Sequence, residues 1–279
     1  MPGCTLADSL SITGVGLHTG QPCTVELRPG QHGLRFVGLT DPQAPAIAAH
    51  VDAIVDTRLA TTLGVGARRV QTVEHLLSAA MGLGLTDLDV AVDGSELPIL
   101  DGTAGAWAQA MLSAGLIQTQ ASVPRLVIDA PVRVTDGDGW MLAEPADRLE
   151  MSLTIDFAHP LIGQQSLYWS QDDDFMAVLG DARTFGFERD VSALQAQGLI
   201  AGGSLDNAVV FSQTGVLNPG GLRSPDEPVR HKAMDMLGDL ALLGHPVQGR
   251  ISGHRPGHGR VIALVRAILA QPSAWHLQA

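Results

Sequence analysis

Residues 228–244 constrain the fold more than any other segment, because they read as one buried helix that carries three ionisable side chains. His231, Asp235 and Asp239 follow one another at intervals of four, so they lie on one stripe of a helix. The other faces are apolar and carry Ala233, Met234, Met236, Leu237, Leu240, Leu242 and Leu243. An unpaired charge in such surroundings is costly. A divalent metal would be a partner for His231 and Asp235, and a structural His–Asp hydrogen bond is the alternative.

A second segment, residues 70–82, predicts a helix with Thr72 as its N-cap and with Glu74 and His75 in its first turn. Adjacent residues cannot share one helix face, so the two side chains would act differently around a common point. His75 can complete a set of two histidines and one aspartate that leaves a coordination position open for water. Glu74 can then accept a proton from that water. The alternative is an acid that favours the helix dipole, next to a packed histidine.

The loop at 249–260 carries His254 and His258 among glycines, a proline and the arginines Arg255 and Arg260. A histidine on a loop near a metal is suited to act as a general acid at neutral pH. Asp239 can hold its imidazolium form by a charge-assisted hydrogen bond. The alternative is a solvated basic loop without a catalytic role, which would have the same composition.

Composition limits the classes of function. The chain has 279 residues, of which 45% are hydrophobic, so two domains of ordinary size with a large core are expected. The net charge of −12 argues against general binding to nucleic acid or anionic membranes, so an anionic substrate would need a local basic patch. Cys4 and Cys23 are too few for a zinc ribbon or a disulfide framework. No apolar run is long enough for a membrane span, and the first residues lack a basic region, which predicts a cytoplasmic protein without a transmembrane segment.

The order of patterns predicts an α+β protein in which each half repeats strands, helix, strand, helix. We expect a first domain over residues 1–120 and a second over 121–279, joined by an aperiodic linker at 117–123, with the site between them. In the first half we expect strands at 23–28, with 34–37 as hairpin partner, and at 88–92, and a helix at 103–114 that ends at Gly115. In the second half we expect a hairpin of 126–134 with 140–143, strands at 151–155 and 247–251, and a helix at 260–270.

One insertion interrupts the second half. Residues 184–218 contain a short predicted helix at 190–197 that Gly198 closes, and apolar residues that include Ile200 and Val210 follow it. A small β-α-β unit with an apolar inner face would cover a groove. An ordinary satellite core is the alternative.

Eight short motifs occur in order between residues 14 and 259, and the similarity that they carry extends from about residue 8 to residue 275. They are GVGLHTG (14–20), TVEHLLSA (72–79), ELPILDGTA (96–104), TIDFAHP (154–160), ARTFGF (182–187), GGSLD (202–206), VRHKAMDMLGD (229–239) and PGHG (256–259). Together they closely resemble the zinc-dependent UDP-3-O-acyl-N-acetylglucosamine deacetylases of lipid A biosynthesis. The resemblance implies a two-layer sandwich of two similar domains, each with an inserted subdomain. It also implies the committed step of that pathway, the removal of the N-acetyl group from UDP-3-O-(3-hydroxyacyl)-N-acetylglucosamine.

The resemblance assigns roles to individual residues. The expected ligands of one Zn²⁺ per chain are His75, His231 and Asp235. The expected catalytic residues are the general base Glu74, the general acid or oxyanion partner His258, its supporting Asp239, and the oxyanion contact Thr184. The expected substrate-binding residues are Lys232, Phe157 facing the nucleotide, Phe185, Arg255, and Ile200 and Val210 in a passage for the acyl chain. Two residues depart from the pattern, Asn207 beside that passage and an extra His254.

The expected partner is a small acylated UDP-sugar, without nucleic acid, and the oligomeric state stays open, a monomer being one option. Two rival functions share these features. One is a zinc amidohydrolase that acts on another acylated amino sugar. The other is a non-catalytic protein that binds a nucleotide sugar or lipid and uses the metal for structure. Structural zinc is usually closed by four protein ligands, and three candidates favour an open catalytic site.

Overall fold

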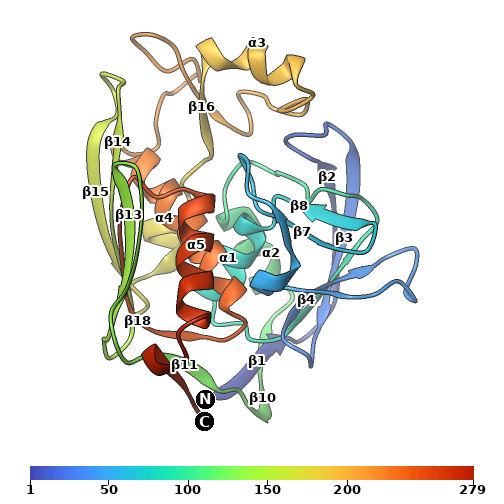
Figure 1. Ribbon diagram of the computed structural model, residues 1–279. Coiled ribbons are helices and arrows are strands. Elements are labelled where there is room, and N and C mark those ends of the chain that lie inside the picture. The colour runs from blue at the N-terminus through green and yellow to red at the C-terminus, as the bar shows by residue number, and fades with distance from the viewer.

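The computed structural model describes residues 1–279 and has two sheets on the outside with helices packed between them (Figure 1). The helices between the sheets are α1 (Glu74–Gly82), α2 (Gly105–Ser113), α4 (Glu227–Leu240) and α5 (His258–Leu269). Each half is a layer of strands and a layer of helices, and α1 of the first half packs against α4 of the second. The predicted α+β sandwich with a duplicated order of elements is therefore confirmed.

The sheet of the first half has the strand order β2-β3-β9-β4-β5. Its strands are β2 (Leu10–Val15), β3 (Pro22–Pro29), β4 (Leu34–Gly38), β5 (Ile47–Ala48) and β9 (Leu88–Val92). The predicted hairpin of β3 with β4 is wrong, because β9 lies between them, antiparallel to β3 and parallel to β4. Val90, Ala91 and Val92 are all buried, so β9 is covered on both faces and belongs in the middle of the sheet.

The central strand of the second sheet is β18 (Val247–His254), which pairs antiparallel with β13 and parallel with β11 and β14. The other strands are β11 (Arg125–Ile128), β12 (Val132–Asp136), β13 (Gly139–Glu144), β14 (Leu149–Phe157), β15 (Gly163–Ser170) and β19 (Trp275–Gln278). The β12–β13 hairpin is confirmed. The expected strand at 126–134 is instead two strands, because Asp129 and Ala130 donate to the Ala274 carbonyl and Pro131 has no N–H for a ladder.

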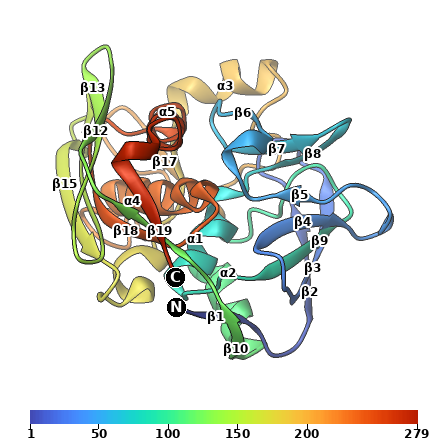
Figure 2. The same cartoon turned by 60° about the horizontal axis from the view of Figure 1, so that its bottom comes forward.

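The expected linker at 117–123 is wrong, since it forms most of strand β10 (Leu116–Ser122). This strand pairs antiparallel with β1 (Pro2–Leu6), at the end of the molecule where both termini lie in Figures 1 and 2. Most side chains of β10 are exposed, so no apolar alternation marks it, whereas the ladder bonds come from the backbone. The domain division at residue 120 stays a prediction.

Each half carries an insert. In the first half, β6 (Ile54–Asp56), β7 (Thr62–Val65) and β8 (Arg68–Gln71) form a three-stranded sheet. In the second half, β16 (Phe185–Phe187), α3 (Glu188–Ala196) and β17 (Val209–Phe211) form the predicted β-α-β unit with parallel strands. In Figure 1, α3 lies at one end of the molecule, apart from the other helices.

Short helical turns complete the structure: η1 (Val51–Ala53), η3 (Ala241–Leu243) and η4 (Pro272–Ala274) are 3₁₀ turns and η2 (Met176–Gly180) is a π turn. No helix combines the length and apolar character that crossing a membrane requires.

Gly238 lets α1 and α4 approach closely. A Cβ atom built on Gly238 would lie 2.0 Å from the backbone carbonyl oxygen of Glu74, so no side chain fits without movement of one helix. Because Glu74 and His75 begin α1, this contact sets where both side chains stand relative to the polar stripe of α4.

Candidate active site

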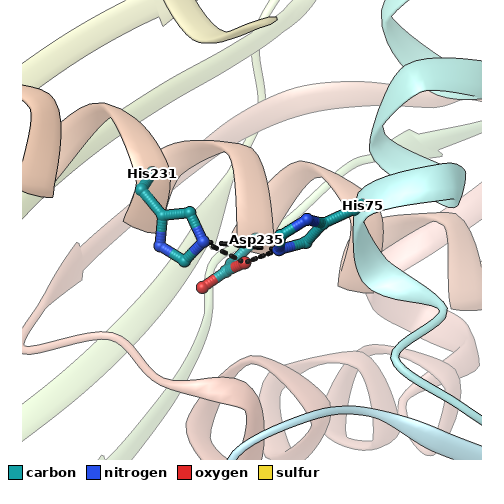
Figure 3. Close-up of side chains that lie close together, drawn as sticks. All are labelled: His75, His231 and Asp235. Carbon is teal, nitrogen blue, oxygen red and sulfur yellow. Dashed lines mark hydrogen bonds and ion pairs between the residues drawn. The ribbon is translucent and has the colours of Figure 1, made fainter. Parts of the chain in front are cut away.

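His75 on α1 and His231 and Asp235 on α4 point toward one another (Figure 3). The two histidine Nε2 atoms lie 3.3 Å apart, and Asp235 Oδ1 lies 3.6 Å from His75 Nε2 and 3.5 Å from His231 Nε2. Metal bonds of about 2.0–2.1 Å in a tetrahedron place neighbouring ligand atoms about 3.3–3.4 Å apart. The three side chains therefore have the spacing of three corners of a metal tetrahedron and can hold a metal ion.

The protonation states of these residues suit a metal. Burial lowers the pKa of His75 to about 4 and lowers the pKa of His231 well below its usual value, so both imidazoles are neutral at neutral pH. Burial acts to raise the pKa of Asp235, but His231 and Lys232 outweigh it and lower the pKa, with Lys232 Nζ 2.8 Å from Oδ2. Lys232 pairs with Oδ2 only, and Asp235 Oδ1 has no hydrogen-bond donor, so this buried oxygen is free to bind a metal ion.

Glu74 and His258 face each other beside His75, His231 and Asp235. Glu74 Oε1 lies 3.7 Å from His258 Nε2. Burial raises the pKa of Glu74 to about 7, although the charge of His258 acts to lower it. Burial acts to lower the pKa of His258, but Asp239, 2.7 Å from Nδ1, and Glu74 outweigh burial and raise it to about 10. The site thus combines a carboxyl group that titrates near neutral pH with an imidazole that stays cationic.

Thr61, just before β7, is a contact of this site that sequence reasoning missed. Its N–H donates to Glu74 Oε2 at 3.0 Å, and its hydroxyl donates to Asp239 Oδ1 at 2.6 Å. The segment between β6 and β7 has no acid, no histidine and no clear periodicity. No sequence signal therefore marks Thr61.

Thr72 does not cap α1, so that prediction is wrong. Val73 takes the cap position, while Thr72 has a left-handed backbone (φ 60°) and its hydroxyl donates to Glu96 Oε1 at 3.0 Å. The buried Glu96 carboxylate also accepts the backbone N–H groups of His18 and Thr19 at 2.8 and 2.7 Å. The Thr72 hydroxyl thus bonds a residue distant in the sequence and does not cap its own helix. Glu96, which begins one of the eight motifs but had no predicted role, joins residues 18–19 to the start of α1.

A cavity of about 430 Å³ contains the five central groups His75, His231, Asp235, Glu74 and His258. Thr184, Phe185 and Lys232 line the same cavity, so the structure brings these sequence candidates to the site. His18 and Arg260 line it as well, although the sequence assigned them no role.

Five sequence candidates do not line this cavity: Asp239, which contacts His258 Nδ1, and Phe157, Arg255, Ile200 and Val210. The Phe157 ring packs on the ring of Phe185 with 5.5 Å between centroids, so Phe157 lies one side chain away from the cavity. Ile200 and Val210 are half-buried on the insert. Their contacts with substrate stay predictions.

The predicted loop at 249–260 is wrong, because His254 is the last residue of β18, Arg255 follows it and His258 begins α5. Arg255 forms ion pairs with Asp138 and, through Nη2 at 2.7 Å, with Asp156, so two carboxylates hold its guanidinium. His254 does not line the cavity either, and nothing in the structure gives it a role.

Three residues that can hold a metal ion and leave one corner free, beside a carboxyl group that titrates near neutral pH and a cationic imidazole, form the arrangement by which metal-dependent hydrolases cleave amides. The fold and the site place the chain in that class. A family model described as UDP-3-O-acyl N-acetylglycosamine deacetylase (LpxC) matches residues 3–270. The chain belongs to this family of metal-dependent deacetylases, as its motifs predicted.

Relatives support the assignment over the whole chain. The UDP-3-O-acyl-N-acetylglucosamine deacetylase of Anaeromyxobacter sp. (strain Fw109-5) is 46% identical over 272 residues, which cover 96% of this chain and 88% of the relative. The protein of the same name from Myxococcus xanthus (strain DK1622) is 45% identical, with 98% and 88% covered. That from Methylococcus capsulatus (strain ATCC 33009 / NCIMB 11132 / Bath) is 41% identical, with 98% and 91% covered.

Proposed function

We propose that this protein hydrolyses the N-acetyl group of UDP-3-O-(3-hydroxyacyl)-N-acetylglucosamine in lipid A biosynthesis, with one zinc ion per chain. The observation that carries the proposal is the convergence of His75, His231 and Asp235 at tetrahedral spacing, in a cavity that also holds Glu74 and His258. Two imidazoles and one carboxylate suit zinc. Relatives that match the chain almost end to end carry the name of this activity.

The chemistry follows from the positions of the side chains. A zinc ion at this centre would supply the Lewis acidity that lowers the pKa of water and polarises the amide carbonyl. Glu74, ionised above its pKa of about 7, accepts a proton from the attacking water. Cationic His258 and the Thr184 hydroxyl stabilise the negative charge that forms on the amide oxygen. When the C–N bond breaks, His258 or protonated Glu74 delivers a proton to the sugar nitrogen, and acetate leaves.

A diphosphate group needs local positive charge in a chain whose net charge is −12. Lys232 lines the cavity beside the proposed ligand Asp235, and Arg255 lies in the short connection between β18 and His258, the first residue of α5. We assign Lys232 and Arg255 to the nucleotide sugar, and Phe157, packed on Phe185, to the nucleotide.

We assign the acyl chain to the β-α-β insert, through Ile200 and Val210. Asn207 does not place a free amide there: its Nδ2 donates to the Gly202 carbonyl at 3.0 Å and its Oδ1 accepts from the Ser204 N–H at 2.9 Å. Because the amide is used within its own turn, the insert can keep an apolar inner face.

Cys4 and Cys23 are free thiols, which fits a reducing compartment. We therefore assign the reaction to the cytoplasm, and a monomer stays an untested option for the oligomeric state.

The test is acetate release from the acylated UDP-sugar by three preparations: chelated protein, zinc-restored protein and the variant Glu74→Gln. We expect activity only with the metal, and we expect Glu74→Gln to bind a full zinc equivalent while its kcat falls about 100-fold or more. UDP-N-acetylglucosamine, which has the same amide but no acyl chain, is the control and should be a poor substrate. Equal rates on both substrates would indicate a general amidohydrolase, and zinc binding without acetate release would indicate a binding protein.

A further inference from the structure

Thr61 is a buried residue at the junction of the two halves. It has no exposed surface and ends the segment that leads into β7, in the insert of the first half. Asp239 on α4 and His258 on α5 belong to the second half, and Thr61 contacts both. One threonine therefore joins groups that are far apart in the sequence.

Thr61 donates a hydrogen bond to one oxygen of each of two carboxylates, and the other oxygen of each carboxylate faces His258. Its N–H donates to Oε2 of Glu74, and Oε1 is then the oxygen that faces His258 Nε2 at 3.7 Å. Its hydroxyl donates to Oδ1 of Asp239, and Oδ2 is then the oxygen that lies 2.7 Å from His258 Nδ1. In each case Thr61 holds one oxygen and leaves the other for the catalytic contact.

We propose that Thr61 is a positioning residue for both the base and the acid of the proposed deacetylation. A hydroxyl has a single proton, and at 2.6 Å this proton goes to Asp239, which fixes the rotation of the Asp239 carboxylate. The fixed carboxylate orients the His258 ring through Nδ1, so that Nε2 points toward Glu74. The inference rests on the proposed function, because the effect is read in kcat for acetate release.

Alanine and serine at position 61 form a matched pair, since they differ by the hydroxyl group alone. We expect Thr61→Ala to lower kcat about tenfold or more, as loss of an outer hydrogen-bond partner does, while KM and zinc content stay unchanged. Thr61→Ser should restore most of the lost kcat. Thr62→Val is the control, because Thr62 is the next residue and its hydroxyl makes none of these contacts. Equal kcat values for the alanine and serine variants would overturn the proposal.

A double-mutant cycle separates positioning from simple stabilisation. If the hydroxyl acts through Asp239, Thr61→Ala should add little to the loss in Asp239→Ala, whereas an independent structural role predicts multiplied losses. Multiplied losses would overturn the proposal.

A substrate-free readout keeps the inference separate from the proposed function. The NMR resonance of the His258 Nδ1–H proton should move in Thr61→Ala and stay in place in Thr62→Val. An unmoved resonance would refute the positioning role whether or not the protein is a deacetylase. Failure of the wild-type protein to release acetate would refute the proposed function and leave this measurement to decide on Thr61.

Discussion

Replacing Gly238 with alanine tests whether the close approach of α1 and α4 sets the metal centre. The new Cβ would lie 2.0 Å from the Glu74 carbonyl oxygen, whereas ordinary contacts begin at 3.4 Å, so the helices must separate by about 1.4 Å. Because His75 follows Glu74 on α1, its Nε2 would move away from His231 and Asp235, which are now 3.3 and 3.6 Å distant. A displacement of this size is large beside metal bonds of about 2.0–2.1 Å.

The effect on metal affinity should exceed the effect on stability. Overpacking costs about 1–3 kcal/mol of unfolding free energy, and alanine recovers about 1 kcal/mol through its helix propensity. The net loss of about 0–2 kcal/mol leaves the protein folded. Disturbing the supports of metal ligands weakens binding about 10–100-fold, and we expect at least this loss for Gly238→Ala.

Competition with a chelator measures the zinc affinity, and thermal unfolding measures stability in the same preparations. Gly186→Ala is the control, because its Cβ would meet no atom within 4 Å. Wild-type zinc affinity and kcat in folded Gly238→Ala would refute the idea that this contact sets the geometry of the centre.

Asp239→Asn should move the basic limb of the pH–rate profile to lower pH. Asp239 holds the pKa of His258 at about 10, so the active cationic form is present below that pKa and is lost as pH rises through it. An unmoved limb would show that the contact between Asp239 and His258 is only structural. His231→Ala should bind less than a full zinc equivalent under conditions that saturate the wild-type protein, and full occupancy would remove it from the ligand set. Val210→Trp should raise KM for long acyl chains far more than for short ones, since each buried CH₂ is worth about 0.8 kcal/mol; equal increases would show that the insert does not bind the chain.

Local geometry is what the sequence by itself determined. The spacing of His231, Asp235 and Asp239 placed all three on one helix face, because helical periodicity depends only on residues within a few turns. Two of them now face His75 and the third holds His258. The β-α-β insert and the β12–β13 hairpin were readable for the same reason, since turns and short helices carry their signals in adjacent residues.

Contacts between distant segments were decided only by the tertiary structure. Strand β9 lies between β3 and β4, and β10 pairs with β1. These pairings depend on the path of the chain in three dimensions, which the residue pattern of a single strand does not contain. The Thr72 hydroxyl donates to Glu96 and does not cap α1, and Thr61 donates hydrogen bonds to both Glu74 and Asp239. A hydroxyl or carboxylate can bond any complementary group that folding brings within about 3 Å, so its partner depends on the assembled structure and cannot be read from neighbouring residues.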